Sequence, residues 1–509
     1  MKLLKCNLLF VFVVSFAFSM YESVYAAPPG IAPLNPGFIQ YHENIKLRSD
    51  PARSGRVHGE IPSPADHAFT RILKPERFRD TPSYALIYDL RNTGKVPPVR
   101  DQSTCGACWA FAAMASAESR LLPQDVNDFS EQDLNVNHGF DYAACQGGND
   151  DMSTAYHSRW SGPLDETTVP YPYALEYADV NSAQTWPAVQ HVQEIIKIPL
   201  RAAFTDNDTI KYFVTTYGAV YVSYFDDSYF SADDESYYNP GSGNVAGVQT
   251  QTNHAVAVIG WDDNYAASNF KTGTQPPGNG AFLIRNSWGT SRHTDGYFWL
   301  SYYDGTFKPR VSYSRIEPDN NYNAIYQYDP LGYVLRYGET SERVFWGANI
   351  FTATTSEHVR AVGFHLTDTG VSYDIYIYSR VTAGAPVSGT RVASKNGFQT
   401  YPGYYTVELD TPVPVAQGDL FSVVIRLEHQ AAGVRQLAIE LDTTALSNPY
   451  AYSSAATSQA NQSFYSSNGV SWLDYYLTFP SLQINNCIKA FTQKTTVIPP
   501  VNLLLLTNG

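Results

Sequence analysis

The chain has 509 residues, a length that exceeds one hydrophobic core and predicts two domains with accessory segments. Its 48 acidic residues outnumber its 34 basic residues, which gives a formal net charge of −14 at pH 7. Because the nucleic-acid backbone is itself anionic, this charge argues against nucleic acid as a partner.

The first residues have the pattern of an export signal. Lys2 and Lys5 precede an apolar run over residues 8–18, and small residues stand at positions 24 and 26, where a signal peptidase reads the chain. A membrane anchor is the alternative, but the run is too short to span a bilayer and no second long apolar stretch follows. We therefore predict a signal peptide over residues 1–26, a secreted or periplasmic protein, and no integral membrane span in the mature chain.

The next stretch, residues 27–83, is rich in proline, glycine and charge. Few of its apolar residues recur at regular spacing, so no long helix is expected. The composition fits either a propeptide or an N-terminal arm.

Cys108 begins the most apolar run of the chain. From Trp109 to Leu122 nearly every residue is apolar or small, which is typical of a buried helix. Pro123 cannot continue a helix, so the helix should end near Leu122. A cysteine in the first turn lies where free N–H groups and the helix dipole favour an anion, and the thiolate is therefore the expected working form.

Four cysteines remain after the leader, and they allow three complete pairings that the sequence alone does not separate. They are Cys105, Cys108, Cys145 and Cys487. The CxxC spacing of Cys105 and Cys108 also suits a redox dithiol or half of a zinc site. A zinc site needs two further close ligands, and only Cys145 and His138 are near; a thioredoxin-like site needs a preceding strand that is not evident. We therefore expect neither a metal nor a cofactor.

A series of short motifs runs through the middle of the chain. In order they are Asp89-Leu90-Arg91, Pro98-Val99-Arg100-Asp101-Gln102, Cys105-Gly106-Ala107-Cys108-Trp109-Ala110-Phe111, Ser130-Glu131-Gln132-Asp133-Leu134, Cys145-Gln146-Gly147-Gly148, Tyr171-Pro172-Tyr173, Gly218-Ala219-Val220, Asn253-His254-Ala255-Val256 and Asn286-Ser287-Trp288-Gly289. This order resembles that of the papain-like cysteine proteases over residues 84–316. The resemblance implies an α+β fold, with a two-lobed peptidase domain made of a helical lobe and a β-barrel-like lobe.

The residue types suit nucleophilic catalysis. A thiol becomes a strong nucleophile when a base takes its proton, and a histidine does this best when a third group fixes its tautomer. Cys108 is the expected nucleophile, His254 the base and Asn286 the orienting amide, while Gln102 and the Cys108 N–H would bind the oxyanion. Taken singly, each has a simpler structural interpretation, such as a buried thiol or a strand-edge histidine. Their order along the chain favours catalysis.

The resemblance assigns further residues. It pairs Cys105 with Cys145 in a disulfide, which leaves Cys108 free. Gly147 and Gly148 would let an extended peptide or protein substrate approach, and Asn253 and Trp288 would contact it or shield the histidine. Two departures leave specificity open, since Asn149-Asp150 and Arg292 stand where relatives often carry other residues.

Residues 317–492 have a different pattern. Short runs rich in Val, Ile, Tyr and Phe alternate with turn residues, which predicts an all-β antiparallel sandwich. The segment resembles the lectin-like domain of some bacterial and archaeal secreted papain-like proteins. Its aromatic residues could stack on a carbohydrate, or they could simply cover the sheet. Residues 493–509 form a short tail.

Two functions follow from these patterns. The first is a secreted cysteine peptidase with a carbohydrate- or partner-binding sandwich. The second is a catalytically silent peptidase scaffold that serves as a surface carbohydrate- or protein-binding protein. The complete set of Gln102, Cys108, His254 and Asn286 favours the first.

Overall fold

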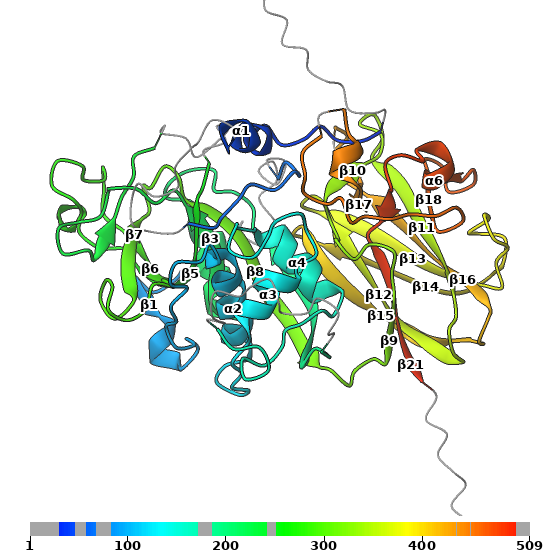
Figure 1. Cartoon of the computed structure of the whole chain (residues 1–509), viewed down its shortest axis with the longest axis horizontal. Helices are drawn as coiled ribbons and strands as arrows, with labels where there is room; N and C mark the ends of the chain where they lie inside the picture. The colour runs from blue at the N-terminus through cyan, green and yellow to red at the C-terminus, as the bar shows by residue number, and fades with distance from the viewer. Residues whose placement is uncertain are drawn as a thin grey trace, which may run out of the picture.

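The computed structural model describes residues 30–45, 58–67, 83–171, 186–241, 251–433, 435–447 and 449–494. The predicted signal peptide and most of the predicted tail lie outside these ranges. Figure 1 shows two bodies side by side, with the cyan helices and green strands in one and the yellow to red strands in the other. None of the helices in these ranges is long and apolar enough to cross a membrane.

The central helix of the first body is the one predicted from the apolar run. It begins at Cys108 and ends at Leu121, and its residues from Cys108 to Ser119 are buried. This central helix is α2 (Cys108–Leu121). The other helices of the first body are α3 (Glu131–Asn137), α4 (Asp150–Ser158) and α5 (Asp208–Tyr217). The side chains of Ser130 and Asn149 accept hydrogen bonds from the first N–H groups of α3 and α4, which fixes where these helices begin.

The strands of the first body are mostly antiparallel and pack against α2. They are β1 (Ile87–Asp89), β2 (Gln190–Lys197), β3 (Val220–Tyr224), β4 (Ser236–Tyr237), β5 (His254–Asp262), β6 (Ala281–Arg285), β7 (Tyr297–Ser301) and β8 (Lys308–Pro318). Every residue of β3 and β6 is buried, and both α2 and α5 pack against β3. The antiparallel pairing of β5 with β6 brings the start of β5 near the end of β6.

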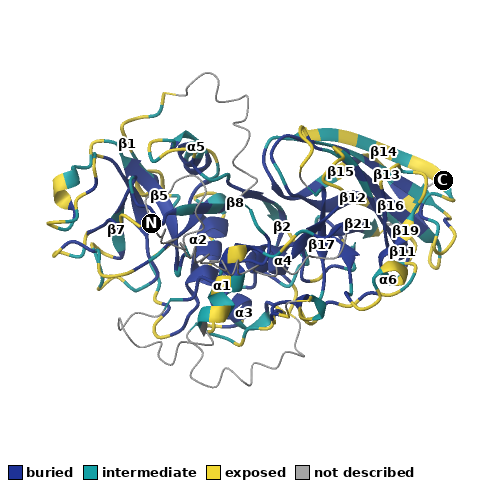
Figure 2. Cartoon of the chain, turned by 90° about the horizontal axis from the view of Figure 1, so that it is seen from above, coloured by how far each residue is buried: buried dark blue, intermediate teal, exposed yellow. Residues whose placement is uncertain are grey.

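The second body is the predicted all-β antiparallel sandwich. Its strands are β9 (Ala324–Tyr326), β10 (Leu335–Tyr337), β11 (Val344–Thr352), β12 (Glu357–Leu366), β13 (Val371–Ser379), β14 (Thr390–Gln399), β15 (Gly403–Val415), β16 (Leu420–Glu428), β17 (Leu437–Glu440), β18 (Ser463–Ser466), β19 (Leu473–Asp474), β20 (Asn485–Asn486) and β21 (Ile488–Lys494), with a short helix α6 (Tyr475–Thr478). One face consists of the sheet β14-β13-β16-β11-β18-β19. Figure 2 shows β14 as its exposed outer strand. The α+β architecture predicted from the sequence is confirmed.

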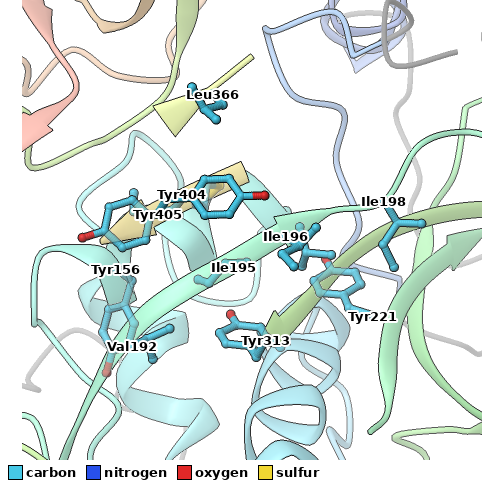
Figure 3. Packing of buried hydrophobic residues seen from close by; sticks show 14 of the residues in the cluster. Tyr156, Val192, Ile195, Ile196, Ile198, Tyr221, Tyr313, Leu366, Tyr404 and Tyr405 are labelled. Atoms are coloured by element: carbon cyan, nitrogen blue, oxygen red, sulfur yellow. The ribbon is translucent and has the colours of Figure 1, made fainter. Parts of the chain in front are cut away.

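The two bodies share one sheet. Strand β15 of the sandwich pairs with β2 of the first body, with Tyr404 opposite Ile195, so the sheet continues from β10 through to β4 among the described residues. Tyr404 and Tyr405 are fully buried there, and Ile195 lies between Tyr404 and Tyr313 of β8 (Figure 3). The shared core fixes the orientation of the sandwich relative to the helices.

The described part of the N-terminal segment lies across both bodies (Figure 1). Ile31 bridges to Tyr337 of β10, and Phe38 of α1 (Pro36–Ile45) is fully buried against Tyr450 and Tyr452. These contacts anchor the segment on the sandwich before it enters the first body.

Candidate active site

Cys108 is the first residue of α2 and is completely buried. Its Sγ accepts hydrogen bonds from the N–H groups of Ala255, at 3.4 Å, and of Gly59, at 3.3 Å. Ala255 follows His254 directly, so the thiol lies against the start of β5. The structure thus brings together two residues that are far apart in the sequence.

His254 is held by Asn286 from the loop after β6. The Nε2 atom of His254 lies 2.9 Å from Oδ1 of Asn286, which can only accept, so Nε2 carries the proton. Trp288 covers this pair, because its ring stacks on the imidazole with centroids 4.5 Å apart. The Nδ1 atom of His254 is buried and has no hydrogen-bond partner among the described residues, which leaves its lone pair ready to take a proton.

Burial keeps both groups uncharged in this arrangement. Desolvation raises the pKa of Cys108 to about 12, and the nearby charge of Glu60 adds to the effect. Desolvation also lowers the pKa of His254 to about 3, with a contribution from His58. The thiolate expected from the helix start is therefore not the favoured form here, because the N-terminal segment excludes water from the sulfur.

Gln102 lies in the loop before α2 and is buried. Its Nε2 donates to the carbonyl of Cys105 at 2.8 Å, and its Oε1 accepts from the hydroxyl of Ser287 at 2.6 Å. These bonds hold the amide in one orientation. Ser287 also accepts the backbone N–H of Gln102 at 2.8 Å, which ties the loop before α2 to the one that follows β6.

Cys105 and Cys145 form a disulfide, and Cys108 and Cys487 are free and buried. The disulfide removes the CxxC pair that a zinc or redox site would require. It also holds the loop that carries Gly148, where an added Cβ would lie 2.3 Å from the Trp109 ring. Only glycine fits at this position.

Residues 59–61 of the N-terminal segment lie in the groove over Cys108. Gly148 donates its N–H to the carbonyl of Gly59 at 2.9 Å and accepts the N–H of Ile61 at 3.0 Å, which makes a parallel bridge opposite Glu60. The N–H of Glu60 donates to the carbonyl of Asn253 at 3.0 Å. Gly148 and Asn253, both predicted as substrate contacts, thus bind an extended chain through their backbones.

The residue before this bridge, His58, contacts the opposite wall. Its Nε2 lies 2.7 Å from Oδ2 of Asp226, and its ring lies 5.8 Å from that of His254 and 6.5 Å from that of Trp288. The side chain of Asn253 in turn accepts the N–H of Asp226 at 2.7 Å. The segment is therefore fixed on both sides of the cysteine.

Comparison with known proteins identifies both domains of the chain. Residues 85–310 match the papain family cysteine protease model, and residues 325–492 match the lectin like domain model. The chain carries a papain-family peptidase domain. It is 29% identical over 231 residues to a senescence-specific cysteine protease of Arabidopsis thaliana and 28% identical over 224 residues to a cysteine protease of Blomia tropicalis. These matches cover 44% and 42% of this chain and 59% and 60% of the relatives, so the chain spans little more than half the length of either.

Solved structures match both bodies at once. The cysteine protease and lectin-like domains of Cwp84, a surface layer associated protein of Clostridium difficile, superpose with a TM-score of 0.72, 24% identity, and coverage of 91% of this chain and 98% of that one. A clostridial Cwp84 structure after propeptide cleavage gives a TM-score of 0.66 at 25% identity, over 80% of this chain and 99% of that one. The two-domain arrangement of this papain-family chain is therefore shared.

Sequence reasoning missed two contributors to the peptidase site. The side chain of His293 is buried, and its Nε2 accepts a hydrogen bond from Nδ2 of Asn286 at 2.9 Å, which fixes the rotation of that amide. Glu60 occupies the groove beside Gly148. Neither belongs to a motif, although His293 stands next to Arg292, which was noted as a departure.

Proposed function

We propose that the chain is an exported cysteine peptidase that hydrolyses peptide bonds in protein substrates through Cys108, His254 and Asn286. One observation carries the proposal. The free thiol of Cys108, at the start of a helix, accepts a hydrogen bond from the residue that follows His254, and Asn286 orients the ring of His254. Cwp84 is described as a surface layer associated protein, and this description supports an extracellular site of action for the chain.

The groups suit a two-step acyl transfer. Nδ1 of His254 takes the proton of Cys108, and Sγ attacks the carbonyl carbon of the scissile bond. The N–H of Cys108 and the amide of Gln102 stabilise the oxyanion, and His254 then protonates the leaving amine. Water, deprotonated by His254, hydrolyses the thioester and releases the acid product with the free thiol.

The N-terminal segment would hold this enzyme inactive. It directs the N–H of Gly59, not a carbonyl carbon, at Sγ, and the carbonyl oxygen of Gly59 is bound by Gly148. That oxygen is therefore not available to the oxyanion donors. Cleavage within residues 68–82, followed by departure of the segment, would open the groove, in keeping with the propeptide cleavage described for Cwp84.

Hydrolysis of a casein or peptide-library substrate tests the peptidase. The intact chain should be folded first and then cut at a protease site introduced within residues 68–82. We expect turnover after the cut, and none from a Cys108→Ala chain cut in the same way. Folded, cut protein that hydrolyses nothing would favour the silent scaffold instead.

A second function, carbohydrate binding, rests on the outer face of the six-stranded sheet. Trp346 stacks on Tyr376 with centroids 6.0 Å apart, and Arg426 and Arg391 lie over these rings. Half-buried aromatic faces beside polar groups are suited to sugar rings. A glycan array probed with the intact chain and with Trp346→Ala tests it, and equal signals from the two proteins would exclude this face.

A further inference from the structure

The side chain of Glu60 fills a pocket beside Gly148. Its backbone lies opposite Gly148 in the parallel bridge, and its side chain is 0% exposed. Any extended chain that pairs with Gly148 in this groove passes the mouth of the same pocket. The segment therefore shows which kind of side chain the pocket accepts.

Two groups bind the carboxyl group of Glu60. NH2 of Arg310 lies 3.0 Å from Oε1, and the hydroxyl of Tyr221 donates to Oε2 at 2.7 Å. Tyr221 is completely buried, so its hydroxyl forms the floor of the pocket. A carboxyl group thus meets a cation and a neutral donor together.

The guanidinium is held in place independently of Glu60. Nε of Arg310 donates to the hydroxyl of Ser223 at 2.7 Å, and its NH2 donates to the hydroxyl of Thr252 at 2.9 Å. The antiparallel pairing of β3 with β8 places Tyr221 opposite Val311, the neighbour of Arg310. The position of the guanidinium therefore does not depend on Glu60.

The acidic neighbour of Arg310 is engaged elsewhere. Oδ1 of Asp150 lies 4.0 Å from NH1 of Arg310, but its Oδ2 binds the ammonium of Lys197 at 2.7 Å. The charge of Lys308 also acts on Glu60 and favours its ionised form. Asp150 therefore weakens the attraction of Arg310 for a carboxylate, but it does not take the place of that carboxylate beside the guanidinium.

We propose that this pocket is a carboxyl-binding specificity subsite, in which Arg310 and Tyr221 select a glutamate side chain at the substrate residue that pairs with Gly148. The inference rests on the proposed peptidase function. An aliphatic side chain would leave the buried Tyr221 hydroxyl without the carboxyl oxygen that accepts its hydrogen bond, and it would leave the guanidinium without the carboxyl group beside it. Sites built around a hydrogen bond reject such analogues by about 100-fold or more.

The pocket also carries a pH signature. Burial raises the pKa of Glu60 to about 7, with the charge of Asp150 adding to it, while Arg310, Tyr221 and Lys308 act in the other direction. The charged or titratable groups that act on Glu60 come from three elements: Arg310 and Lys308 from β8, Tyr221 from β3, and Asp150 from α4. Lys197 of β2 binds Asp150, and Glu60 in turn acts on Cys108 of α2. The raised pKa means that burial outweighs the attraction of Arg310 and Lys308, so the pocket holds the carboxyl group more tightly when it is protonated than when it is ionised. A glutamate substrate should therefore bind best below its free pKa of about 4.5 and lose that advantage as the pH rises through about 7.

The residue next to Glu60, Gly59, lies at Sγ, so the substrate residue that pairs with Gly148 should be the second one before the cleaved bond. The test uses fluorogenic peptides that differ only at this residue, with Glu, Gln or Leu. The enzyme is the full chain, folded intact and then cut within residues 68–82. At about pH 5.5 we expect kcat/KM for Glu to exceed that for Gln by roughly tenfold and that for Leu by about 100-fold. The Glu to Gln ratio should fall roughly tenfold or more at about pH 8, whereas pH effects on catalysis itself cancel in the ratio.

Arg310→Met should abolish the preference for Glu over Gln, and Arg315→Met on the same strand should keep it. If Arg310→Met does not fold, the kcat/KM values of the wild-type enzyme for the three peptides still test the proposal. Equal or higher kcat/KM for Leu, with Cys108 labelled by iodoacetamide, would overturn the subsite alone. Absence of both labelling and cleavage would overturn the peptidase proposal and, with it, the subsite.

Discussion

A single methyl group at residue 59 should open the groove. Gly59 lies against the backbone of Gly106, and a Cβ at residue 59 would stand 1.9 Å from the Gly106 carbonyl oxygen, so Gly59→Ala must move the segment by about 1 Å. The bonds of residues 59–61 to Cys108, Asn253 and Gly148 span 2.9 to 3.3 Å and would be lost by such a shift. At about 1 kcal/mol each, three or four of them are worth ~3–4 kcal/mol, or a factor of roughly 100 to 1000 in the docking equilibrium.

The assay is the rate of iodoacetamide labelling of Cys108 in the uncut chain, followed by mass spectrometry. In the closed arrangement the raised pKa of Cys108, about 12, leaves almost no thiolate at neutral pH, so the wild-type chain should label very slowly. We expect Gly59→Ala to label faster by at least about tenfold. Gly418→Ala is the control, because it strains a remote turn but meets no atom within 4 Å. If Gly59→Ala labelled as slowly as wild type, the segment would not be what protects the thiol.

Three further changes test other parts of the structure. Asn286→Ala removes the hydrogen-bond partner of His254, the proposed base, and should lower kcat by roughly tenfold to 100-fold with little change in KM, measured on the cut chain. Replacing both Cys105 and Cys145 by serine opens a loop of sequence separation 40 and should lower the free energy of unfolding by about 4 kcal/mol, measured in urea, and an unchanged midpoint would refute it. Lys489→Met leaves the buried Asp329 carboxylate without its ion-pair partner at 2.8 Å and should cost about 3–5 kcal/mol. Adding Asp329→Leu should recover part of that loss, and a further loss would contradict the argument.

The central helix and the fold class could be predicted because their signals are local. The apolar run after Cys108 and the stop at Pro123 predict a buried helix, and the helix ends at Leu121. The motifs around His254 and Asn286 lie at the start of β5 and the end of β6, where antiparallel pairing brings them together. In this part of the chain the local pattern and the family resemblance therefore predict the same structure.

The contents of the groove could not be predicted, because they depend on tertiary contacts. Nothing in the sequence around Glu60 indicates that it meets Arg310, since their contact arises from the pairing of β3 with β8 and from a bridge to Gly148. The expected thiolate at Cys108 failed for the same reason, because the covering segment adds a desolvation cost that exceeds the effect of the helix start.

The junction between the two bodies could not be predicted from the sequence either. The sandwich strands were recognised by their composition, but composition does not say which strand pairs with which. The pairing of Tyr404 in β15 with Ile195 in β2 joins a late strand to an early one across the domain boundary. Only the register of the folded sheet reveals it.

Labelling with an epoxide inhibitor of papain-like enzymes tests the central claim most directly. The chain is folded intact, cut within residues 68–82, treated with the epoxide, and analysed by mass spectrometry beside a Cys108→Ala control. The account predicts one adduct, on Cys108, that is absent from the uncut chain, from the control and from denatured protein. No adduct on the cut, folded chain at any pH from about 5 to about 8 would contradict the claim that Cys108 and His254 form a working nucleophile and base.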